Sequence, residues 1–197
     1  MSQPESQTRE VVEHFPAGGS QAWWLSQKRD TSRILDRPTW LTSPEGDTSQ
    51  VEDFAAIVED IRVMLESADH EELEDGVETP LIPSLHRLVT TRGVGAVFEL
   101  AGLIVAGTVD SVIASWILRW LGRIPHRPTH EARRWLLEKG LYSAVPTVRD
   151  GAALGLVSLG DCRSVPALRA AVDREQHYVR LRWNLEQALQ QLDEHTR

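Results

Sequence analysis

From residue 51 to the C-terminal end, apolar residues recur at intervals of three and four, the spacing that places them on one face of an α-helix. No segment shows the alternation of apolar and polar residues that is typical of a half-buried strand. The pattern therefore predicts an all-α fold. After a first helix that begins near Val51, we expect helices near residues 79–93, 94–107, 110–122, 129–140, 147–160, 164–174 and 178–193.

The first of these helices is predicted to be amphipathic, and Ser49 and Glu52 have the spacing of a capping box at its start. Its carboxylates, among them Glu59, Asp60 and Glu66, fall outside the apolar stripe and are expected to face water. The stripe expected to face the core consists of Val51, Phe54, Ala55, Val58, Ile61 and Leu65.

Helix starts and stops divide the apolar middle of the chain. Thr79 is expected to cap one helix, and another helix is expected to begin after Thr129. Gly93 and Gly140 are expected to end helices. The stretch from residue 100 to residue 118 is long enough to span a bilayer, but Asp110 lies at its centre at a cost of about 3 kcal/mol for insertion. We therefore expect a turn at residues 107–110 between two buried helices, and no membrane span.

The last third of the chain contains a repeated pattern. Val148-Arg149 opens a helix that is rich in small residues and ends in Leu159-Gly160-Asp161, and Val165-Pro166 opens the next. A second Val-Arg pair follows 31 residues after the first, at Val179-Arg180. This pattern resembles the bacterial HEAT repeat over about residues 142–193, and Trp120-Leu121-Gly122 with the helix after it looks like a degenerate copy. The resemblance implies a right-handed α-solenoid of antiparallel helix pairs.

The residue types of the repeat have physical reasons. Ala152, Ala153 and Gly155 are small enough for two helices to approach closely, Gly160 suits a left-handed turn, and Pro166 fits an early helical position because its missing N–H needs no partner there.

The family resemblance also implies ion pairs between successive repeats, for which Arg149, Asp161 and Arg180 are the matching residues. The chain departs from the family at Cys162, where proline is frequent, and at Trp183-Asn184, where small residues are expected. The helix from Val179 is therefore interpreted as a terminal cap.

Three regions are expected along the chain: a disordered or loosely packed arm at 1–20, a tryptophan-rich and acidic helical cap at 21–78, and the HEAT-like repeats at 79–197. Trp23 and Trp24 belong to an aromatic patch interrupted by prolines. Two interpretations stay open for them, because large aromatic side chains cover the end of a core or anchor a binding partner.

The net charge of −8 is unevenly distributed. Residues 1–100 contain 8 Lys/Arg and 19 Asp/Glu, a net charge of −11, whereas residues 101–197 contain 13 and 10, a net charge of +3. Such a balance argues against broad binding to nucleic acid, which rests on an excess of cations. The acidic segment is a solvated face or a docking surface for a basic protein, with the candidate contacts Glu59, Asp60, Glu66, Glu71 and Glu72.

The compartment is expected to be the cytoplasm. Cys162 is the only cysteine and cannot form an internal disulfide, and the polar residues 1–10 do not lead into the apolar core of a secretion signal.

Motifs for catalysis and cofactor binding are scarce. The chain has no Gly-x-Ser-x-Gly, no phosphate-binding loop and no His-Glu-x-x-His, so we expect no cofactor. His70-Glu71 and His130-Glu131 resemble the dipeptides that hold two irons in deoxyhypusine hydroxylase, a HEAT-repeat enzyme, but that family uses four. Arginines interleave with tryptophans from Arg119 to Trp135, a mixture that contacts nucleic acid in other proteins. We expect these arginines to lie at a rim or to pair with the acidic half.

The sequence thus favours a non-enzymatic HEAT-like module that binds another protein, with an immunity or antitoxin-type inhibitor, or an adaptor, as its concrete forms. The alternative is a metal-dependent or nucleic-acid-directed enzyme on the same fold. The number of copies in the assembly is not predicted.

Overall fold

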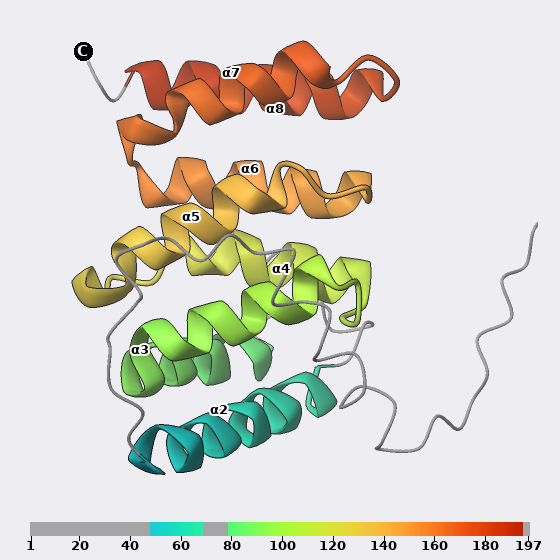
Figure 1. Cartoon of the computed structure of the whole chain (residues 1–197). Helices are drawn as coiled ribbons and strands as arrows, with labels where there is room; N and C mark the ends of the chain where they lie inside the picture. The colour runs from blue at the N-terminus through green and yellow to red at the C-terminus, as the bar shows by residue number, and fades with distance from the viewer. Residues whose placement is uncertain (1–47, 69–78, 195–197) are drawn as a thin grey trace, which may run out of the picture. The chain divides into compact units, whose positions relative to one another are not determined.

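The computed structural model of the chain describes residues 48–68 and 79–194, and every regular element among them is helical (Figure 1). The all-α class is therefore confirmed for this part of the chain, and the helix bounds lie close to the predicted ones. The α-helices are α2 (Thr48–Glu66), α3 (Leu81–Val105), α4 (Ser111–Leu121), α5 (His130–Gly140), α6 (Pro146–Leu159), α7 (Val165–Arg174) and α8 (Val179–Glu194). Short 3-10 turns, η3 (Arg127–Thr129) and η4 (Cys162–Ser164), precede α5 and α7.

Each helix packs on helices that lie close to it along the chain. α2 lies on α3, α3 contacts α4 and α5, and α6 contacts α4, α5 and α8, which also packs on α7. Apolar side chains from all of these helices form one continuous hydrophobic core. The most extensive helix–helix contact is that of α4 with α6.

α3 is broken where the sequence predicts the end of one helix and the start of another. Gly93 has φ +63° and ψ −139°, a conformation that residues with a Cβ rarely adopt. By length and composition alone α3 could cross a membrane, a property that it shares with core helices of soluble proteins. Its side chains at Leu85, Val89 and Val97 are buried in the core of this protein.

The predicted turn after α3 is also present. Asp110 caps α4 by accepting hydrogen bonds from the backbone N–H groups of Val112 at 2.7 Å and Ile113 at 3.3 Å. The apolar stretch from residue 100 to residue 118 is therefore two helices separated by a capped turn, as predicted.

The prediction of the inward face of α2 is partly wrong. Ile57, Ile61 and Met64 are buried, whereas Ala55 is exposed and Val58 is half-buried. These buried residues form a second stripe at the same helical spacing, and α3 covers it because Gly95 leaves room for the Ile57 side chain. The side chains of residues 48–53, including the predicted capping box, lie outside the described part.

The predicted threonine cap at Thr79 is wrong. Pro80 occupies the cap position of α3, and Thr79 Oγ1 is buried with no hydrogen-bond partner among the described residues. α5 begins directly after Thr129, as predicted, and the Thr129 hydroxyl makes no cap bond. It lies instead 3.0 Å from His126 Nδ1 and accepts from Arg133 Nε at 3.2 Å.

Glycines let the backbones of α4 and α6 touch. A Cβ on Gly155 of α6 would overlap Leu118 O of α4 and lie 2.5 Å from Leu137 Cδ2, and a Cβ on Gly151 would overlap Ser115 of α4. Gly122, at the end of α4, faces Gly155 just as closely. The small-residue contact predicted for α6 is therefore confirmed, and Gly160 ends the helix in the predicted left-handed conformation, with φ +67°.

Gly155→Ala tests this contact. The added methyl group has no space, so we expect the free energy of unfolding to fall by about 1–3 kcal/mol, measured by urea denaturation. Gly102→Ala is the matched control, because Gly102 is also helical and a Cβ there would meet nothing within 4 Å. The control should be neutral or stabilising by up to about 1 kcal/mol. Equal effects of the two substitutions would contradict the close approach.

Candidate functional site

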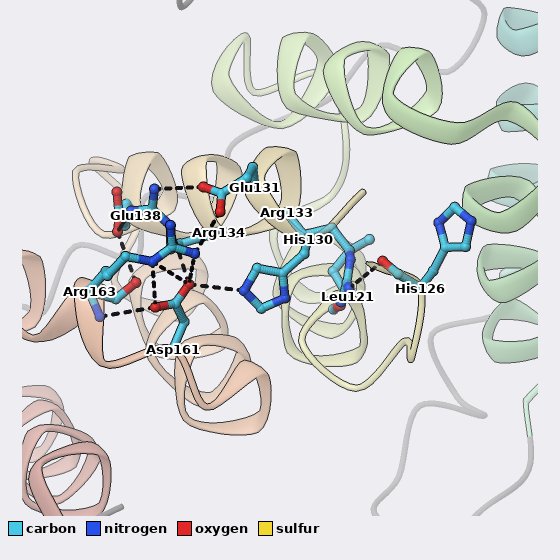
Figure 2. Close-up of polar contacts among 10 residues, drawn as sticks. Leu121, His126, His130, Glu131, Arg133, Arg134, Glu138, Asp161 and Arg163 are labelled. Carbon is cyan, nitrogen blue, oxygen red and sulfur yellow. Dashed lines mark hydrogen bonds and ion pairs between the residues drawn. The ribbon is translucent and has the colours of Figure 1, made fainter. Parts of the chain in front are cut away.

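Asp161 is the centre of the largest polar cluster in the described chain (Figure 2). It follows Gly160 at the end of α6 and caps η4 by accepting from Arg163 N at 3.0 Å. Its carboxylate also accepts from Arg163 Nε at 3.0 Å and Nη2 at 2.6 Å, and His130 Nε2 lies 2.9 Å from Oδ2. Asp161 thus joins the start of α5 to the turn that precedes α7.

The charge state of Asp161 follows from these partners. Hydrogen bonds from Arg163 hold the pKa of the Asp161 carboxyl well below its ordinary value, and the bond with His130 lowers it further, against the opposing effect of burial. The carboxylate is therefore ionised at neutral pH and contributes stability in that form.

The cluster continues along α5. Arg134 donates to Glu131 at 2.9 Å and to Glu138 at 2.8 Å, and Arg163 donates to Glu131 at 2.6 Å. Ser164 donates to Glu138 at 2.8 Å. Hydrogen bonds from Arg134 and then Arg163 lower the pKa of Glu131. Figure 2 shows the side chains of α5 and of the turn before α7 pointing toward one another in this network.

This network bears on the metal alternative. The His130 side chain is turned toward Asp161 and the Glu131 carboxylate toward two arginines, so the dipeptide does not present a shared ligand pair. Among the described residues no group of three or more His, Cys, Asp or Glu side chains is arranged to hold a metal ion. His70 and Glu71 lie outside the described residues.

The ion pair implied by the family resemblance has other partners here. Arg149 donates to Glu175 at 2.6 Å and to the carbonyl of Ser143 at 2.8 Å, while Asp161 binds Arg163 and His130. Glu175, at the end of α7, is the carboxylate that packing brings next to Arg149. Arg180 is exposed on the first turn of α8, and Pro166 occupies the first turn of α7 as predicted.

Some of the arginines between α4 and α5 have partners within these helices and the turn that joins them. Arg133 is buried and donates to the carbonyl oxygens of Leu121 at 2.6 Å and His126 at 3.0 Å, so it caps the C-terminal end of α4. Burial lowers the pKa of its guanidinium. Arg123 lies over the ring of Trp120, with 4.4 Å to the ring centroid.

One exposed surface of α2, which we call the α2 face, consists of three acidic residues and a valine: Glu59, Asp60, Val63 and Glu66. The three carboxylates are exposed, as predicted. Arg62 forms ion pairs with Glu59 and Glu66, and Arg92 of α3 donates to Asp60 at 2.8 Å. Surface pairs of this kind contribute only about 0–1 kcal/mol each. The carboxylates are therefore held in place but stay accessible to another cation.

An apolar side chain lies at the centre of this face. Val63 is 50% exposed and lies one helical turn from all three carboxylates. It also borders an open groove of about 310 Å³ between α2 and α3, whose apolar wall includes Met64 and Leu88. Val63 and Arg92 were not among the contacts predicted from the sequence. Helical spacing around Asp60 would have found Val63, whereas Arg92 is far away in sequence and comes close only through packing.

The other predicted contacts cannot be placed in the same way. Trp23, Trp24, Glu71 and Glu72 lie outside the residues that the structure describes. The α2 face is thus the part of the predicted partner-binding surface that the fold brings together.

Comparison with known proteins finds no match for this chain among family models, curated proteins or solved structures.

Asp161→Asn tests the polar cluster. At pH 7 we expect the free energy of unfolding to fall by about 1–3 kcal/mol, because a buried charged acceptor is lost. The folded-state pKa of Asp161 is lowered, so its contribution is present above the ordinary carboxyl pKa and is lost as the pH falls. The difference between wild type and variant should therefore shrink below about pH 4. Asp173→Asn, on the exposed side of α7, is the control; a gap that is independent of pH would contradict the argument.

Proposed function

We propose that this chain is a non-enzymatic, HEAT-like helical module that binds a basic protein in the cytoplasm, either as an immunity or antitoxin-type inhibitor or as an adaptor. The fold proposal is a right-handed solenoid with a tryptophan-rich N-terminal cap. Its support is the repeated motif together with the packing order, in which α6 contacts α4 before it and α8 after it. The left-handed Gly160 and the early helical Pro166 are the motif positions that fit best.

The observation that carries the binding proposal is the arrangement of the α2 face. An exposed apolar side chain, Val63, is surrounded by three exposed carboxylates beside a groove. Interfaces commonly combine an apolar centre with a charged rim that selects the partner. The corresponding partner carries an apolar anchor flanked by Lys or Arg, and these cations compete with Arg62 and Arg92 for the carboxylates of α2.

The absence of an enzymatic role is supported by how the candidate chemical groups are used. His130, Glu131 and Asp161 are bound into the polar cluster that joins α5 to the turn before α7. Their bonds serve the packing of helices, and the α2 face is made of residues outside this cluster.

Charge reversal on the α2 face tests the binding proposal. Glu59→Lys and Glu66→Lys should each reduce the recovery of a basic partner by about tenfold, and the remaining binding should depend less on salt. Affinity purification from the native cells at low and high salt, with quantitative mass spectrometry, measures both effects. Val63→Ser should reduce recovery without changing the salt dependence.

Two controls separate binding from general charge and hydrophobicity. Asp173→Lys makes the same change in net charge on α7, and Val105→Ser removes an exposed valine from α3. Both should retain the partner. If reversal at all five positions, Glu59, Asp60, Glu66, Glu71 and Glu72, leaves every copurifying protein bound with unchanged salt sensitivity, the acidic docking surface is wrong.

A further inference from the structure

The outer side of α8, the last described helix, carries two strongly exposed large apolar residues, one of them the most exposed of the described chain. Leu181, Leu185 and Leu192 point into the core. On the opposite side Val179 is 82% exposed and Trp183, one turn later, is 60% exposed. A tryptophan on the side of a helix that faces away from the core indicates a surface that another molecule covers.

The same helix also carries a hollow. An open depression of about 400 Å³ lies along its C-terminal half, and the described residues that line it are Glu186, Leu189, Gln190, Asp193 and Glu194. Trp183 and Gln190 are seven residues apart, which is about 10 Å along a helix. One helix therefore presents a protruding ring at one end and a space for such a ring at the other.

The two ends of α8 also carry opposite charges. Arg180 and Arg182 lie in the first turn, and Asp193 and Glu194 in the last. Arg182 binds Glu186 at 3.0 Å on the exposed surface, and Asp193 lies 3.8 Å from Arg169, so neither charge is buried or fixed by a strong pair. Turned end for end, the basic turn of one α8 lies opposite the acidic turn of another.

We propose that α8 pairs with α8 of a second copy of this chain, in an antiparallel arrangement about a twofold axis near residues 187 and 188. Trp183 of each copy enters the hollow of the other, and Arg182 lies opposite Asp193 of the second copy. A twofold axis produces each contact twice, which is why a single helix with complementary ends suffices. The pairing involves no residue of the α2 face and is independent of the function proposed above.

The size of the surface sets the expected strength. Sixteen residues of helix span about 24 Å, and one face of such a helix buries less than the roughly 800 Å² per partner of a standard interface. We therefore expect a reversible dimer with a dissociation constant in the micromolar range, about −8 kcal/mol or weaker.

Sedimentation of the full chain at about 5 to 500 μM, a range chosen to span micromolar affinity, tests the pairing. We expect a shift from monomer to dimer across this range. Trp183→Ser should weaken the dimer at least about tenfold, whereas Tyr142→Ser, which removes a similarly exposed aromatic ring outside α8, should leave it unchanged. A chain that stays monomeric throughout, or a dimer that Trp183→Ser does not weaken, overturns the proposal.

A mixing experiment tests the geometry. Arg182→Glu places two carboxylates opposite each other, and Asp193→Arg places two guanidinium groups opposite each other, so each variant alone should be weakened about tenfold or more. An equimolar mixture of the two variants restores opposite charges at both contacts and should recover dimers. Failure of the mixture to do so contradicts the antiparallel register, since a mutation that merely damaged the fold would not be rescued by mixing.

Discussion

The contact between the backbones of α4 and α6 is the constraint on which the rest of the structure depends. Side chains keep the axes of most packed helices about 8–10 Å apart, but Gly151 and Gly155 have no side chain at the point where α6 crosses α4. α6 also contacts α5 and α8, so its distance from α4 sets the position of the C-terminal helices. The close approach requires glycines in a helix interior, and each glycine lowers the stability of the helix by about 1 kcal/mol relative to alanine.

Polar groups then fix how the helices join. Asp161 connects α6 to α5 through His130 and to the next turn through Arg163, and Arg149 connects α6 to Glu175 at the end of α7. Arg133 connects α5 to α4 by capping the C-terminal end of α4. These polar contacts include His130 and Arg133, whose residue types first suggest a metal site and a basic surface. The α2 face and the outer side of α8 lie at opposite ends of the described helices (Figure 1).

The distinction between local and distant information explains which predictions were confirmed. The helix bounds, the turn at Asp110, the left-handed Gly160 and the place of Pro166 each depend on a few neighbouring residues, and the structure has all of them. The prediction of the inward face of α2 was partly wrong because two apolar stripes share Ile61. Only the packing of Ile57 against Gly95 selects the stripe that is buried. The candidate carboxylates of α2 were correctly predicted to be exposed, but their partner Arg92 was not foreseen.

The sequence by itself determined the all-α class, the order and bounds of the helices and the acidic outer side of α2, because helix periodicity and start and stop signals act over about one turn. Only the tertiary structure decided which charged groups meet. Asp161 faces His130 from 31 positions away, Arg149 meets Glu175 across 26, and Asp60 meets Arg92 across 32. Ion pairing depends on distance in space, and the packing of the helices sets these distances, which lie beyond the reach of signals that act over one helical turn.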